Sequence, residues 1–152
     1  MMNPIFRNTI MRILKTTALS LALLFPATAF AEQAILYKNP QCGCCEGHAE
    51  HLRANGIDVK SVATHDLALK RQEQGVPMDL VGCHMLMIDG YVVEGHVSAA
   101  TVKRLLTERP AVKGISLLGM PIGSPGMEGP KTEPFIIYTF GGSGEPQVFA
   151  VE

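Results

Sequence analysis

The chain has 152 residues, 47% of them hydrophobic, which is enough for one domain with a single buried core and too short for two. Its formal net charge is −1, so it lacks the excess of basic residues that nucleic-acid binding requires. Without the first 31 residues, 10 Lys and Arg would stand against 14 Asp and Glu, a formal charge of −4. Nucleic acid is therefore excluded as the expected partner.

Residues 1–31 have the pattern of a secretory signal peptide. Three basic residues and no acidic ones precede or flank the apolar run ALSLALLF, residues 18–25. That run is shorter than the roughly 20 residues of a membrane span, and the segment ends in Ala29-Phe30-Ala31, a small-x-small cleavage pattern. We therefore expect a periplasmic mature domain, residues 32–152, with no membrane span, in an oxidising compartment. Met11 is an alternative start of the same signal.

Apolar periodicity and turn residues predict alternating strands and helices in the first part of the mature chain. Asp89-Gly90 predicts a tight hairpin turn. Ser98 can cap the last helix of this part, and Pro110 ends it. The expected elements, in the order βαβαββα, are strands at 34–39 and 58–64, helices at 45–56 and 67–74, a hairpin at 84–95 and a helix at 99–109.

The remainder of the chain has a different composition. Residues 114–134 are rich in glycine and proline, which predicts a long loop. Two short apolar runs, 135–140 and 146–151, are separated by GGSG and predict a β-hairpin.

Cysteines at the junction of the first strand and the first helix, in a chain of order βαβαββα, are typical of a thioredoxin-like arrangement. The expected fold class is therefore α/β, with a thioredoxin-like βαβαββα core, a long Gly/Pro-rich loop and a C-terminal β-hairpin. A thiol at a helix N-terminus lies near unpaired N–H groups and the positive end of the helix dipole, which favour the thiolate.

The cysteine cluster contains two overlapping motifs that point to different chemistry. In the C-x-x-C pair, Cys42 and Cys45 could form a redox disulfide. The middle residue, Cys44, supplies a third sulfur that such a pair does not need. With Cys83 before the third strand as a fourth, the set could bind a soft metal: Cu(I), zinc or an iron–sulfur cluster. A structural disulfide to Cys83 is the third reading, but it leaves two cysteines awkwardly close in sequence.

Histidines near these cysteines are further candidates. His48 lies one turn after Cys45, so it is an additional possible ligand. His84 is expected to alternate with Cys83 along a strand, so that one of the two faces away. For His96 the sequence identifies no partner.

Met120 and Met127 flank PIGSPG in the expected loop, where neither a helical nor a strand period assigns them a packing role. Thioethers are soft donors that suit Cu(I). The two methionines are therefore candidate metal ligands.

Three separated motifs resemble a known family: YKNPQCGCC at residues 37–45, GCHM at 82–85 and GMPIGSPGM at 119–127. Together they look like the CopG-type periplasmic copper-resistance proteins, over about residues 34–151. The resemblance implies a thioredoxin-like domain that holds copper, as Cu(I) and in a multi-copper cluster, in copper tolerance. Other periplasmic copper-handling proteins are implied as partners. The family's matched residues here are Cys42, Cys44, Cys45, Cys83, Met120 and Met127.

NPQCG after a strand also resembles the glutaredoxin-like arsenate reductases. Cys44 and Cys45 replace the small hydroxyl residues that would follow in that family, which argues against arsenate. A periplasmic thiol–disulfide oxidoreductase that uses Cys42 and Cys45 stays as the alternative function. The sequence leaves open whether the protein turns over copper or only holds it.

Overall fold

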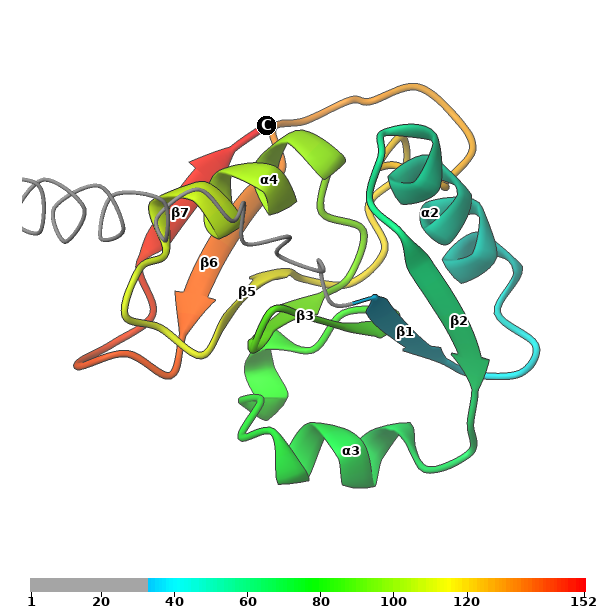
Figure 1. Cartoon of the computed structure of the whole chain (residues 1–152). Coiled ribbons are helices and arrows are strands. Elements are labelled where there is room, and N and C mark those ends of the chain that lie inside the picture. Colours follow the sequence, from blue (N-terminus) through cyan, green and yellow to red (C-terminus); the bar gives the residue numbers. More distant parts are fainter. Residues whose placement is uncertain (1–32) are drawn as a thin grey trace, which may run out of the picture. The chain divides into compact units, whose positions relative to one another are not determined.

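A seven-stranded mixed sheet organises residues 33–152, the part of the chain that the computed structural model describes (Figure 1). The expected signal peptide, residues 1–31, lies outside the described residues. No helix in the described part is long and apolar enough to cross a membrane. The strands are β1 (Ala34–Lys38), β2 (Val59–Ala63), β3 (Met85–Ile88), β4 (Tyr91–Glu94), β5 (Gly114–Leu117), β6 (Ile136–Phe140) and β7 (Val148–Val151); the helices are α2 (Gly43–Ala54), α3 (Leu67–Glu73), the short 3-10 helix η1 (Met78–Leu80) and α4 (Ala99–Glu108).

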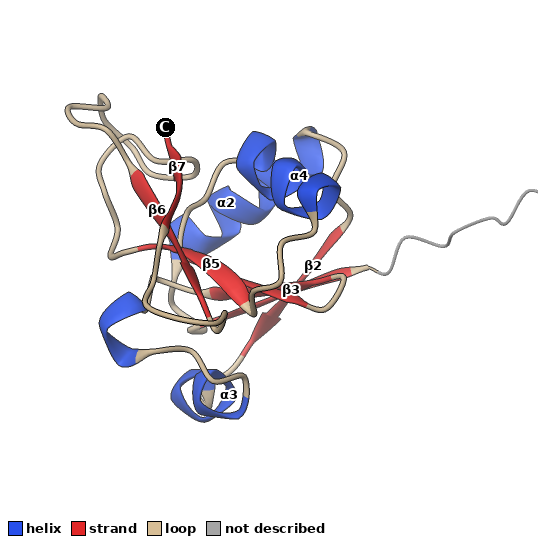
Figure 2. Cartoon of the chain, turned by 90° about the vertical axis from the view of Figure 1, so that its left-hand side faces the viewer, coloured by secondary structure: helices blue, strands red, loops and turns tan. Residues whose placement is uncertain are grey.

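The strand order β2-β1-β3-β4 followed by β5-β6-β7 confirms the expected thioredoxin-like core. β1 pairs in parallel with β2 and antiparallel with β3, and β3 forms an antiparallel hairpin with β4. Helices α2 and α4 cover one face of the sheet, and α3 lies on the other (Figures 1 and 2). Helix α2 follows β1 after a short connection, so its N-terminus lies near the end of that strand, where the cysteines were expected.

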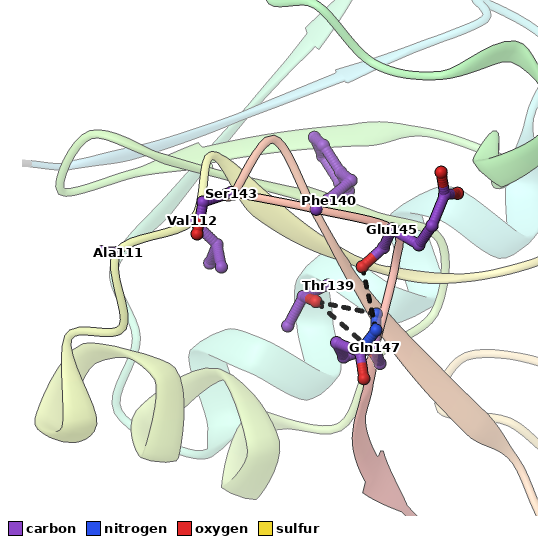
Figure 3. Close-up of a pocket in the computed structure, with 9 residues that line it drawn as sticks. Ala111, Val112, Thr139, Phe140, Ser143, Glu145 and Gln147 are labelled. Atoms are coloured by element: carbon purple, nitrogen blue, oxygen red, sulfur yellow. Dashed lines mark hydrogen bonds between the residues drawn. The ribbon is translucent and has the colours of Figure 1, made fainter.

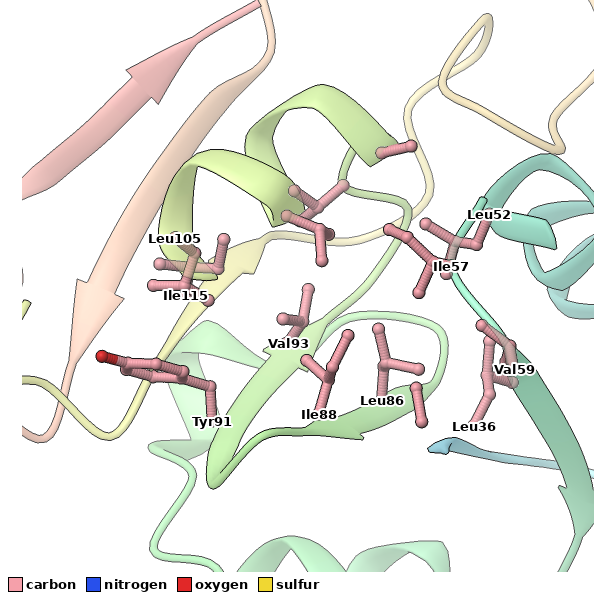
Figure 4. Packing of buried hydrophobic residues seen from close by; sticks show 14 of the residues in the cluster. Leu36, Leu52, Ile57, Val59, Leu86, Ile88, Tyr91, Val93, Leu105 and Ile115 are labelled. Carbon is pink, nitrogen blue, oxygen red and sulfur yellow. The ribbon is translucent and has the colours of Figure 1, made fainter. Parts of the chain in front are cut away.

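The main core lies between the sheet and helices α2 and α4 (Figure 4). Leu36, Leu86 and Val93 form one cross-strand row on that face, since Leu36 is opposite Leu86 and Leu86 is opposite Val93. Leu52 of α2 and Leu105 of α4 pack against this row, and all five side chains are fully buried. Burial of each such side chain contributes about 1.5–3 kcal/mol, so the two helices are held firmly over the sheet.

Two expectations from the sequence are wrong in detail. Residues 114–117 form β5 rather than loop, pairing in parallel with β4 and antiparallel with β6. This strand is buried along its whole length, so it lacks the polar–apolar alternation that marks a half-exposed strand. Helix α2 begins at Gly43, two residues before the expected start at Cys45. The C-terminal hairpin of β6 and β7 is confirmed.

Candidate metal centre

The four cysteine sulfurs converge at the N-terminus of α2. Cys42 is the residue before the helix, with extended backbone angles (φ −80°, ψ 97°) and no capping hydrogen bond from its side chain, and Cys44 and Cys45 lie in the first turn. Cys83 reaches them from the turn before β3: its Sγ is 3.3 Å from Cys42 Sγ, 3.7 Å from Cys44 Sγ and 3.2 Å from Cys45 Sγ. All four Sγ atoms lie within 4.8 Å of one another, as expected.

A disulfide joins Cys42 to Cys45, while Cys44 and Cys83 are free thiols. This is the pairing of a C-x-x-C redox motif and not a structural link to Cys83. Both free thiols lie beside the bonded sulfurs, with Cys44 Sγ 3.4 Å from Cys42 Sγ. The centre as described therefore offers two thiols, and reduction of one disulfide would offer four.

Cys83 is a protonated thiol in the metal-free protein near neutral pH. Burial raises its pKa to about 12, and the hydrogen bond with Cys44 acts in the same direction. The expectation of ionised sulfur, made for the helix N-terminus, thus does not extend to Cys83. Coordination reverses this state, because a thiol loses its proton when it binds a metal ion.

A buried ion pair fixes the turn that carries Cys83. The Glu94 carboxylate, fully buried, accepts hydrogen bonds from Arg71 Nε at 3.0 and 3.1 Å and from Arg71 Nη2 at 2.9 Å. The same carboxylate accepts the Gly82 N–H at 2.9 Å, and Arg71 Nη2 donates to the Gly82 carbonyl at 2.8 Å. Both backbone groups of the residue before Cys83 are therefore held by this one pair.

Gly82 also allows a close approach of two turns. A Cβ at this position would overlap with the Cα and N atoms of Gly95, so only glycine fits. Gly82 precedes Cys83, and Gly95 precedes His96. The contact therefore brings the side chains of Cys83 and His96 to the same end of the sheet.

Three fully buried histidines lie beneath the sulfurs: His48 of α2, His84 after Cys83, and His96 after β4. Their ring centroids are 4.7 Å apart for His48 and His84, 5.1 Å for His48 and His96, and 4.8 Å for His84 and His96. Burial lowers the pKa of all three, that of His48 to about 4. The cluster is therefore neutral near pH 7.

Hydrogen bonds determine which ring nitrogens carry protons. His48 Nε2 lies 2.8 Å from the Val97 carbonyl, which only accepts, so this nitrogen is the donor. His48 Nδ1 must then accept from His84 Nε2, 2.7 Å away, which leaves His84 Nδ1 unprotonated. His96 Nδ1 donates to the Pro125 carbonyl at 2.7 Å, so its Nε2 is unprotonated too.

These two unprotonated nitrogens, His84 Nδ1 and His96 Nε2, are buried without a hydrogen-bond partner among the described residues. One ring nitrogen of each histidine and the sulfurs of Cys45 and Cys83 all lie within 4.8 Å of one another. The structure thus brings together a sulfur set and a mixed sulfur–nitrogen set that share two cysteines.

The sequence did not single out this histidine cluster. The expectation that Cys83 and His84 face opposite ways is wrong, because the two residues lie in a bend before β3 and not on the strand. Both ring nitrogens of His48, the additional candidate ligand, are engaged in hydrogen bonds in the metal-free protein, where it supports His84. A usable signal was present: Cys83-His84 and Gly95-His96 both flank strands at the same end of the sheet.

The loop with the two candidate methionines packs on α2. Gly126 of this loop contacts the backbone of Gly47 and His48 in α2. A Cβ atom at Gly126 would overlap with that backbone. The bond from His96 to the Pro125 carbonyl fastens the same loop from the other side. Met127 is half-buried in this loop, while Met120 is 54% exposed.

A separate cavity of about 190 Å³ lies near the β6–β7 turn (Figure 3). There Gln147 donates its backbone N–H to Thr139 Oγ1 at 3.1 Å and its side-chain amide to the Glu145 carbonyl at 3.1 Å. Its lining contains neither cysteine nor histidine. It therefore offers no donor set comparable to the sulfur and imidazole cluster.

Comparison with known proteins bears on this site. Residues 80–127 match a family described as "Protein of unknown function, DUF411". The solved structure titled "Copper resistance protein copG- Form 1" is 36% identical with a TM-score of 0.72, and the match covers 78% of this chain and 95% of that one. This chain belongs to the CopG family. The CopG structure titled Form 2 is 37% identical with a TM-score of 0.73, covering 78% and 96%. No curated protein sequence matches the chain.

The CopG-family relationship confirms the resemblance drawn from the three sequence motifs. The DUF411 match, residues 80–127, includes Cys83, both histidines with free nitrogens, and the loop with Met120 and Met127.

Proposed function

We propose that this protein binds copper as Cu(I) on Cys42, Cys44, Cys45 and Cys83 and serves copper tolerance. The convergence of four sulfurs within 4.8 Å carries the proposal. The separations between the Cys83 sulfur and the other three, 3.2–3.7 Å, are close to the roughly 3.8 Å expected between ligands of a tetrahedral site with bonds of about 2.3 Å. Thiolates favour soft ions, Cu(I) among them, and sulfurs this close can bridge several ions in a cluster. Membership of the CopG family supports copper as the cargo.

Loading of this sulfur set depends on the Cys42–Cys45 disulfide. With the disulfide intact, only Cys44 and Cys83 can become thiolates. Reduction by two electrons and two protons frees the other two sulfurs. We therefore expect reduced protein to hold Cu(I) far more tightly than disulfide-bonded protein.

Export is the second part of the proposal. Residues 1–31 are a signal peptide cut after Ala31, and the mature domain, residues 32–152, works in the periplasm with other copper-handling proteins. The charge pattern and the Ala29-Phe30-Ala31 sequence support this. The intact mass of exported protein checks the cut: a retained leader would contradict periplasmic function.

The decisive experiment compares wild type with Cys44→Ser under anaerobic, reducing conditions. The variant should lose at least about tenfold in Cu(I) affinity against a competing chelator, or roughly 1.4 kcal/mol, because only the metal set uses the middle sulfur. Its Cys42–Cys45 pair should still oxidise and reduce. His65→Ala, an exposed histidine outside the centre, is the control and should bind as wild type does. Unchanged copper stoichiometry and affinity in Cys44→Ser would exclude the four-sulfur site.

Met120 and Met127 are proposed as thioether donors or shields over the loaded sulfurs. Their loop is held against α2 by the contact of Gly126 with His48, and a neutral sulfur suits Cu(I) better than Cu(II). In the competition against a chelator, the double variant Met120→Ala with Met127→Ala should retain Cu(I) more weakly than wild type. Thermal unfolding of its metal-free form should be nearly unchanged. Lost stability with unchanged retention would assign both residues to packing.

The disulfide at the start of α2 favours one alternative, a thiol–disulfide oxidoreductase that uses Cys42 and Cys45. Cys44→Ser separates the two functions, since an exchange enzyme does not need that sulfur. Disulfide-reducing activity that is preserved in Cys44→Ser, together with unchanged copper binding, would favour the enzyme.

A further inference from the structure

We propose that the disulfide-bonded form carries a second kind of metal site, in which Cys83 Sγ, His84 Nδ1 and His96 Nε2 bind one divalent ion of borderline softness. The site is distinct from the all-sulfur set, because it needs neither Cys42 nor Cys45 as a thiolate. The inference rests on the proposed copper function only in naming Cu(II) as the physiological ion. The donor set itself stands on the geometry below.

The first step concerns the two imidazoles. Both are fully buried, and each has one ring nitrogen committed as a donor, His84 to His48 and His96 to the Pro125 carbonyl. The remaining lone pairs, on His84 Nδ1 and His96 Nε2, have no partner among the described side chains and backbone. A buried polar atom without a partner costs about 1–3 kcal/mol. Two such atoms side by side indicate a ligand that accepts electron pairs.

The second step identifies the sulfur that joins them. Cys45 and Cys83 both lie within 4.8 Å of the two imidazoles, but Cys45 is bonded to Cys42. Cys83 is therefore the thiol available in this form. Cys44, whose Sγ is 3.7 Å from Cys83 Sγ, stands next to it as an outer neighbour.

The third step is the choice of ion. A set of two imidazoles and one thiolate is that of copper electron-transfer sites, and mixed cysteine–histidine sets also bind zinc. Imidazole competes poorly with thiolate for Cu(I) but suits divalent ions. The same pocket would thus prefer a divalent ion when the disulfide is closed and Cu(I) when it is open.

The fourth step is the support around the ligands. Metal-bound histidines in proteins usually donate their other N–H to a carbonyl or another acceptor, which fixes the ring. Here His96 donates to the Pro125 carbonyl, and His84 donates to His48, which in turn donates to the Val97 carbonyl. The supporting hydrogen bonds are present before any ion binds.

The test uses Co(II), which does not oxidise thiols, on full-length disulfide-bonded protein whose free-thiol count and mass have been verified. Wild type should bind one equivalent and show the near-ultraviolet thiolate-to-Co(II) charge-transfer band. Cys83→Ser should lose that band, and His96→Gln should bind at least about tenfold more weakly. Cys44→Ser should keep the band and change affinity by less than tenfold. Thermal unfolding of each variant identifies any that fail to fold.

A measurement on wild type keeps the proposal testable even if a variant does not fold. X-ray absorption of the Zn(II) complex of disulfide-bonded protein should show two nitrogen scatterers and one sulfur scatterer from the protein. Sulfur-only coordination, equal Co(II) binding by His96→Gln, or no binding by the disulfide form would overturn the site. None of these three results would contradict Cu(I) binding by the reduced protein. Conversely, if Cys44→Ser bound Cu(I) as tightly as wild type, only the four-sulfur proposal would be overturned.

Discussion

Arg71→Met is expected to lower the free energy of unfolding of the metal-free protein by about 3–5 kcal/mol, the usual cost of leaving a buried charge unpaired. Glu94 is fully buried and would keep only the Gly82 N–H as a partner. Chemical denaturation measures the change. Because Arg71 also holds the Gly82 carbonyl, alkylation of the neighbouring Cys83 thiol should become faster in folded protein.

Two comparisons isolate the ion pair. Arg104→Met removes a cation that pairs with Glu108 on the surface, with side chains 48% and 47% exposed, and should change stability little. The double change Arg71→Met with Glu94→Met removes both charges and should be less destabilised than Arg71→Met alone. If Arg71→Met costs no more than Arg104→Met, the buried pair does not hold the Cys83 turn.

Acid is expected to destabilise the metal-free protein steeply as the pH falls from about 6.5 toward 4. Burial lowers the pKa of His48 to about 4 and lowers those of His84 and His96 from the ordinary value of 6.5. Below pH 6.5 these histidines therefore bind protons in the unfolded chain but not in the folded protein. The free energy of unfolding consequently rises with pH in this window. Each imidazole contributes up to about 1.4 kcal/mol per pH unit. Burial raises the pKa of Glu94, which opposes this trend by at most one proton.

Denaturant unfolding at a series of pH values gives the slope directly. His48→Gln removes one of the three imidazoles, so its slope should be smaller by about one proton than that of wild type. A free energy of unfolding that stays constant between pH 6.5 and 4.5 would show that the buried histidines are protonated in the folded state.

The first part of the fold could be predicted because its helices have one buried and one exposed face and because its buried β3–β4 hairpin contains a clear turn signal. Ala49 and Leu52 in α2, and Val102 and Leu105 in α4, have helical spacing, and Asp89-Gly90 marks a tight turn. β5 could not be recognised in the same way. It is four residues long and buried throughout, and it directly precedes a segment rich in glycine and proline, so its composition resembled a loop.

The cysteine set could be predicted from the sequence, whereas the histidine cluster could not. Convergence of the cysteines follows from local chain geometry, because three of them start one helix and Cys83 lies at the turn beside it. The histidine cluster depends on helix α2, which carries His48, meeting the two turns that carry His84 and His96 at one end of the sheet. Gly82 and Gly95 allow the two turns to approach closely. The predicted hairpin places these turns at one end of the sheet, but the sequence does not show that His48 of α2 lies against them.

The missing cap of α2 has a consequence for release. Helix starts usually carry Ser, Thr, Asp or Asn, whose side chain accepts a first-turn N–H at a gain of about 1 kcal/mol. Cys42 occupies that place and makes no such bond. If the proposed Cu(I) site is loaded, the negative charge on the sulfurs would take over this role at the positive end of the helix dipole. Cargo and first turn then stabilise each other. Under the proposed function, fraying of that first turn would weaken metal binding, and so would be a route for release of the ion.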